Sequence, residues 1–169
     1  IYAVGNESDR KLEVPGHELA GVHTATEFVG WYNAHPDYAD HEFALTGTDT
    51  AVVIGNGNVA MDVCRVLLQD PERLASTDIG ATALDALRQG TVRRVFLVGR
   101  RGPAQAAFSP KEVKELAGLD GVQLVVAPEE VAVSEVTLKW LAEDAPRSAQ
   151  KNLDFMTQAV EATSASSDS

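Results

Sequence analysis

The sequence predicts an α/β fold with a partial, Rossmann-like, doubly wound parallel sheet. An unbroken apolar run at residues 51–55 leads into the glycine-rich turn Gly55-Asn56-Gly57-Asn58. A helical pattern follows from about Asn58 to Gln69, and a second apolar run covers Val92–Val98. Apolar runs without polar alternation are typical of parallel strands covered on both faces, and the order strand–turn–helix–strand is typical of a βαβ unit.

Weaker patterns surround this unit. Capping residues and the helical spacing of apolar side chains predict further helices. We expect a helix after Asp70-Pro71, helices at residues 24–33, 81–88, 110–116, 134–143 and 147–160, and a third parallel strand at 122–126. On the helix at 58–69, we expect Val59, Val63, Val66 and Leu67 to face the core. The Ser-, Ala- and Asp-rich tail at 162–169 has little to bury, so we expect disorder there.

These elements suggest three parts. Residues 1–48 contain the end of one domain's strand and a linker with a short helix. Residues 49–130 form the Rossmann-like domain, and residues 131–169 form a helical segment with the tail. The first five residues, Ile1–Gly5, resemble the end of a buried strand, which needs partners on both sides. We therefore expect further sequence upstream of Ile1.

Composition limits the classes of function. A net charge of −11 over 169 residues argues against a nucleic-acid binder or an anionic-membrane binder. No apolar run of about 18 residues occurs, so we expect no membrane span. The single cysteine, Cys64, cannot form an internal disulfide, and with no apolar leader this favours the cytoplasm. We expect no metal site, because the four histidines lack metal-ligand spacing: His17, His23, His35 and His41.

The turn after the first strand matches the G-x-G-x-x-A pattern of dinucleotide-binding sites at Gly55, Gly57 and Ala60. Gly55 permits the tight turn, Gly57 lets the backbone approach a pyrophosphate, and Ala60 lets the helix pack closely on the strand. The helix N-terminus then offers unpaired N–H groups and the positive end of its dipole to an anion. The alternative is a glycine turn that only joins strand to helix.

Two adjacent arginines, Arg100 and Arg101, follow the second strand, where NAD-binding folds usually carry Asp or Glu for the ribose 2′-hydroxyl. A carboxylate would repel a 2′-phosphate, whereas guanidinium groups bind it. We therefore predict NADP(H) over NAD(H). Arg100 lies 43 positions after Gly57 instead of about 20, which an inserted helical segment at 71–90 would explain. The alternative is a solvated pair at a strand end.

Glu112 and Glu115 lie three positions apart on one face of the predicted helix at 110–116. This face begins just past the arginine pair, so it is a candidate lining for the nicotinamide end of the cofactor. The alternative is a solvated helix surface.

Four segments together resemble ferredoxin–NADP reductases of the adrenodoxin reductase type. They are Ile1–Gly5, Phe28–Asn33, Val53–Ala60 with Asp62, Val63 and Arg65, and Val98–Pro103 with Gln105–Phe108. The last two are specific for this family, and the resemblance covers roughly residues 1–130.

The resemblance implies a flavoprotein enzyme in which an NADPH domain interrupts an FAD domain. NADPH would give a hydride to FAD, which would pass single electrons to a ferredoxin-like iron–sulfur protein. Residues 1–5 would then end a strand of the FAD domain. The resemblance also implies pyrophosphate contacts from Asn56, Gly57, Asn58 and Val59, 2′-phosphate contacts from Arg100 and Arg101, further NADP contacts from Arg10 and Glu112, and a catalytic place near the flavin for Glu115.

The family's FAD-binding G-x-G-x-x-G and its C-terminal glycine–tryptophan segment do not occur in residues 1–169. We therefore expect FAD only in the full-length protein. This part alone should be inactive, and an open sheet edge without the FAD domain should promote self-association. Two alternatives stay open: the NADPH-handling part of another flavoprotein, such as a glutamate synthase, and a non-enzymatic NADP-binding module.

Overall fold

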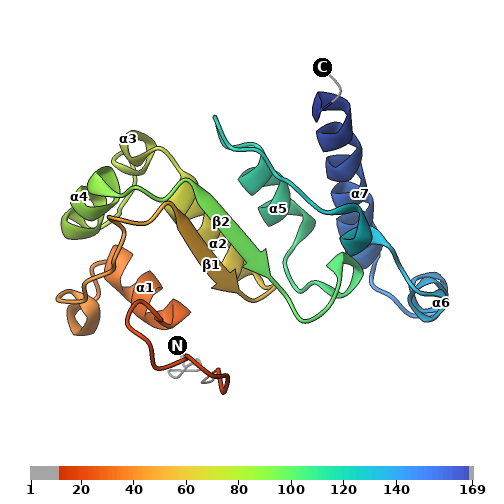
Figure 1. Cartoon of the computed structure of the whole chain (residues 1–169), viewed down its shortest axis with the longest axis horizontal. Helices are drawn as coiled ribbons and strands as arrows, with labels where there is room; N and C mark the ends of the chain where they lie inside the picture. The colour runs from red at the N-terminus through yellow and green to blue at the C-terminus, as the bar shows by residue number, and fades with distance from the viewer. Residues whose placement is uncertain (1–11, 168–169) are drawn as a thin grey trace, which may run out of the picture. The chain divides into compact units, whose positions relative to one another are not determined.

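The computed structural model of the chain describes residues 12–167, with side chains through Thr163. The predicted strand at residues 1–5 and the predicted site residue Arg10 lie outside these residues. The elements are α1 (Ala25–Tyr32), η1 (Pro36–Tyr38), β1 (Thr50–Ile54), α2 (Asn58–Leu68), α3 (Pro71–Leu74), α4 (Ala81–Gln89), β2 (Arg94–Val98), η2 (Pro103–Gln105), α5 (Pro110–Ala117), η3 (Pro128–Val131), α6 (Glu135–Glu143) and α7 (Arg147–Ser167) (Figure 1).

The chain folds as two compact units, each made from two stretches of sequence. The first unit contains the described residues up to Ala51 together with Gln69–Arg94, and the second contains Val52–Leu68 with the described residues from Val95 onward. The insertion predicted at 71–90 therefore forms α3 and α4 of the first unit. The glycine turn and the arginine pair both belong to the second unit, so this insertion explains their long separation in sequence. The boundaries of the three predicted parts stay a prediction.

In the first unit, α1 begins with a capping box. The Glu27 amide donates to Thr24 Oγ1 at 3.3 Å, and the Thr24 amide donates to Glu27 Oε2 at 2.7 Å. These bonds satisfy two N–H groups that the helix itself leaves without partners. Phe28 and Trp31 are buried on the inner face of α1, and their rings lie 5.1 and 4.8 Å from that of Phe43.

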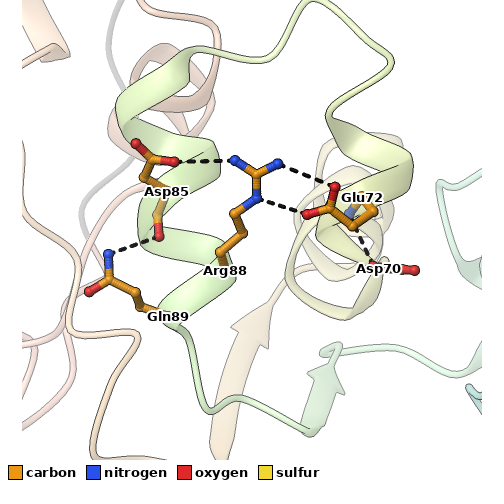
Figure 2. Close-up of polar contacts among 5 residues, drawn as sticks. All are labelled: Asp70, Glu72, Asp85, Arg88 and Gln89. Atoms are coloured by element: carbon orange, nitrogen blue, oxygen red, sulfur yellow. Dashed lines mark hydrogen bonds and ion pairs between the residues drawn. The ribbon is translucent and has the colours of Figure 1, made fainter.

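A polar clamp joins α3 and α4 within the same unit (Figure 2). Arg88 of α4 donates from Nε to Glu72 Oε1 at 2.9 Å and from Nη1 to Asp85 Oδ1 at 3.3 Å. The hydrogen bond to Glu72 raises the pKa of the Arg88 guanidinium. Asp70 caps α3 by accepting from the Glu72 amide at 3.0 Å. Because the clamp is exposed, it contributes little to stability.

The second unit is built on a parallel sheet of β1 and β2, whose arrows run the same way in Figure 1. Val53, Val95 and Leu97 point from one face of this sheet toward the core. Helices α2, α5 and α7 and the segment before α5 supply the buried core residues: Met61, Cys64, Phe108, Val113, Leu116 and Met156. This arrangement is a partial Rossmann-like fold, as the sequence predicts.

The other face of the sheet carries Val52, Ile54, Phe96 and Val98, which are 47–61% exposed. We call these four residues the open sheet face. The prediction of a sheet covered on both faces is therefore wrong for the described chain. Both strands are apolar on both faces, but only one face has helices packed on it.

Three further expectations are wrong. Residues 122–126 form no strand, because no neighbouring strand pairs with them. They keep a strand-like alternation, since Leu124 and Val126 pack on the core whereas Val125 is exposed. The tail predicted to be disordered continues α7 as far as Ser167, because extending a formed helix costs far less than starting one. Finally, Val59 is exposed, although Val63 and Val66 are buried as expected.

Candidate functional site

The glycine turn joins β1 to α2 with a backbone that only glycine adopts easily. Gly55 has a φ of +147°, and its amide donates to the Val98 carbonyl of β2 at 2.8 Å. A Cβ placed on Gly57 would meet no atom within 4 Å, so the space beside it is open. Within residues 12–167, no acceptor pairs with the backbone amides of Asn58, Val59 and Ala60. Asn58 and Val59 are exposed, so the start of α2 presents their N–H groups to solvent.

The turn is attached directly to the arginine pair. Asn56 Nδ2 donates to the Arg101 carbonyl at 2.9 Å, across 45 positions of sequence. To make this bond, the Asn56 side chain crosses Gly99 so closely that a Cβ there would overlap its terminal atoms. Gly99 is therefore part of the site, although no sequence pattern marks it.

A third segment, residues 106–109, holds the turn through consecutive backbone amides. The amides of Ala107 and Phe108 donate to the Asn56 carbonyl at 2.7 and 2.9 Å. The Ser109 amide donates to Asn58 Oδ1 at 2.8 Å. This segment overlaps the Gln105–Phe108 stretch that carried the family resemblance, but its contact with the turn was not predicted. Three segments thus meet at Asn56 and Asn58.

Arg100 and Arg101 are exposed. Among the described residues, neither side chain has an ion pair or a hydrogen bond. By contrast, Arg65 is bound to Asp62 at 2.6 Å. Two uncompensated positive charges therefore lie at a strand end whose backbone is bonded to the glycine turn. Together with the positive end of the α2 dipole, they favour an anion.

The two predicted acidic site residues lie on α5. Ser109 Oγ caps this helix by accepting from the Glu112 amide at 3.3 Å, and Glu112 is half-buried. Glu115 is exposed, and its Oε1 lies 3.4 Å from Lys111 Nζ. An ion pair of this kind is ordinary on a helix surface. The cofactor roles of Glu112 and Glu115 stay a prediction.

No reactive cysteine, metal site or membrane-spanning helix is found among the described residues. Burial raises the pKa of the Cys64 thiol to about 12, which suppresses the reactive thiolate. No group of three His, Cys, Asp or Glu residues within 12–167 has the geometry of a metal site. The helices of that range include none that is both long and apolar enough to cross a membrane.

Curated proteins align with most of the chain. NADPH-ferredoxin reductase FprA of Mycobacterium tuberculosis is 56% identical over 131 residues, which are 78% of this chain and 28% of the relative. Mitochondrial NADPH:adrenodoxin oxidoreductase is 46% identical over 134 residues in Arabidopsis thaliana, covering 79% of this chain and 28% of the relative. The human protein of that name is 50% identical over 128 residues, covering 76% and 26%. This chain is homologous to one segment of these reductases.

A solved structure supports the same conclusion for the fold. The solved structure of Mycobacterium tuberculosis FprA in complex with NADPH superposes on this chain with a TM-score of 0.84 and 46% identity, covering 94% of this chain and 34% of that chain. No family model matches the chain. The chain spans about 28% of the length of FprA. The resemblance to reductases of the adrenodoxin reductase type is therefore confirmed for this segment.

Proposed function

We propose that this chain is the NADPH-binding part of a flavin-dependent ferredoxin–NADP reductase. One observation carries the proposal: the Asn56 side chain binds the Arg101 carbonyl and so joins the glycine turn to the arginine strand end. Homologues named as NADPH-ferredoxin and NADPH:adrenodoxin reductases support it.

The residues of the turn and the strand end fit NADPH. The open amides of Asn58 and Val59 and the empty space at Gly57 suit a pyrophosphate. The exposed, uncompensated guanidiniums of Arg100 and Arg101 suit a 2′-phosphate. When bound, NADPH supplies a hydride. The role of this chain is to bind and orient the nucleotide.

Three further roles belong to the full-length protein in this proposal. It binds FAD, accepts the hydride there and passes electrons to a ferredoxin-like iron–sulfur protein. Glu115 lies near the flavin, whereas Glu112 and Arg10 contact NADP. A cytoplasmic location is also proposed, because the single cysteine Cys64 can form no internal disulfide, although some of the relatives are named as mitochondrial.

The test is electron transfer by the full-length protein from its native host. We expect a yellow, flavin-containing protein heavier than 18.0 kDa, whose flavin is bleached by NADPH and which then reduces a ferredoxin. A flavoprotein that reduces no ferredoxin but forms glutamate from glutamine and 2-oxoglutarate would support the glutamate synthase alternative. A flavin-free protein that binds NADP⁺ without catalysis would support the binding module.

A further inference from the structure

Asn152 of α7 is a polar side chain in an otherwise apolar part of the core. It is 0% exposed, and it lies on the same helix as the buried residues Ala149, Leu153 and Met156. Its Nδ2 donates to the Phe108 carbonyl at 3.0 Å, and its Oδ1 has no partner among the described residues. A buried amide with an unsatisfied oxygen destabilises the core relative to an apolar residue of similar size. Core packing therefore does not explain this residue.

The bond from Asn152 fixes one peptide plane of the candidate site. The Phe108 carbonyl and the Ser109 N–H belong to the same planar peptide group and point in opposite directions. Holding the carbonyl with Asn152 therefore aims the N–H at Asn58 Oδ1, which lies 2.8 Å from the Ser109 nitrogen. A bond accepted at the carbonyl also strengthens the bond donated by the N–H.

The bond from Ser109 in turn controls where the Asn58 side chain lies. An asparagine side chain at the start of a helix readily accepts from the amide two or three positions further on, which for Asn58 is the amide of Ala60 or Met61. In this structure Asn58 Oδ1 accepts from Ser109 instead, and the Ala60 amide has no acceptor within residues 12–167. The bond therefore holds the Asn58 side chain away from its own helix, next to the Asn58 and Val59 amides that are proposed to bind the pyrophosphate.

We propose that Asn152 is a positioning residue for the pyrophosphate turn. It holds the peptide between Phe108 and Ser109, which holds the Asn58 side chain away from its own helix. This inference rests on the proposed NADPH function. Asn152 itself is buried and touches no nucleotide.

The test measures nucleotide affinity in the full-length protein by calorimetric titration. Asn152→Leu removes the donor and the unsatisfied oxygen while it keeps the number and branching of the side-chain heavy atoms. We expect NADP⁺ to bind about five- to tenfold more weakly to the folded variant, which corresponds to the loss of about one hydrogen bond. Met156→Leu is the matched control, because it alters buried packing on α7 without touching this bond, and it should leave the affinity unchanged.

A second probe separates positioning from general damage. Adenosine 2′-monophosphate carries the 2′-phosphate but no pyrophosphate, so Asn152→Leu should leave its affinity unchanged. In an Asn58→Ala background, Asn152→Leu should have no further effect on NADP⁺. Equal weakening of both ligands, or unchanged NADP⁺ affinity in the folded variant, would overturn the inference.

Hydrogen exchange on the unsubstituted protein provides a check that needs no core variant. The Ser109 amide should exchange its hydrogen as slowly as the amides inside α5. Exchange at the rate of an amide without a hydrogen-bond acceptor would refute the proposed bond from Ser109 to Asn58. Failure of the proposed function gives a different result, because the unsubstituted protein would then bind neither NADP⁺ nor NAD⁺.

Discussion

Gly99→Ala changes one contact of the candidate site and leaves the backbone free of strain. Gly99 does not have a positive φ, so alanine can adopt its conformation. The new methyl group would overlap the terminal atoms of the Asn56 side chain, which must then rotate away. The cost is the bond from Asn56 Nδ2 to the Arg101 carbonyl. An exposed hydrogen bond of this kind contributes about 1 kcal/mol, which corresponds to about fivefold in affinity for NADP⁺.

A double-mutant cycle on the full-length protein isolates that contact. Gly99→Ala and Asn56→Ala should each weaken NADP⁺ binding about fivefold, because each removes the same bond. The double variant should be no weaker than either single variant. Gly102→Ala is the control, since a Cβ there would lie 3.8 Å from its nearest neighbour and should change nothing. If the loss of NADP⁺ affinity in the double variant equalled the product of the two single losses, the link between the turn and the arginine pair would be refuted.

Three other predictions follow from the same structure. Gly57→Ala should keep the free energy of unfolding within about 1 kcal/mol of the unsubstituted value, because nothing lies within 4 Å of the added carbon. Calorimetry should nevertheless show at least about tenfold weaker NADP⁺ binding. Unchanged affinity would contradict a pyrophosphate at the turn. Burial raises the pKa of the Cys64 thiol from 9.0 to about 12. The thiol's contribution to the free energy of unfolding should therefore be complete below pH 9 and lost as the pH rises toward 12. In Cys64→Ala, the free energy of unfolding should not show this fall between pH 9 and pH 12. The isolated 169-residue chain should self-associate in sedimentation through its open sheet face, and a monomer that unfolds cooperatively would contradict this.

The strand–turn–helix unit could be predicted because its determinants are local. A φ of +147° requires a residue such as Gly55, and the apolar spacing of α2 is visible within a dozen residues. The arginine pair was also visible, because it directly follows a strand. Residues 122–126 have an equally strand-like pattern, but a strand also requires a partner, and no local pattern shows whether one is present.

The contacts that organise the site depend on residues far apart in the sequence. Asn152 lies on the same helical stripe as Ala149, Leu153 and Met156, a spacing that marks it as facing the core. Its partner Phe108 is 44 positions away, and only the folded chain identifies it. The same holds for Gly99, whose importance depends on the path of the Asn56 side chain.

The central claim is that Arg100 and Arg101 bind the 2′-phosphate of a nucleotide whose pyrophosphate lies at the glycine turn. Its most direct test is a calorimetric comparison of NADP⁺ and NAD⁺ in the full-length protein and in the Arg100→Ala/Arg101→Ala variant. We predict that the unsubstituted protein prefers NADP⁺ and that the double variant loses about 30-fold or more in affinity for NADP⁺, with NAD⁺ binding unchanged. Equal affinities for the two nucleotides before substitution, or an equal loss for both after it, would contradict the account.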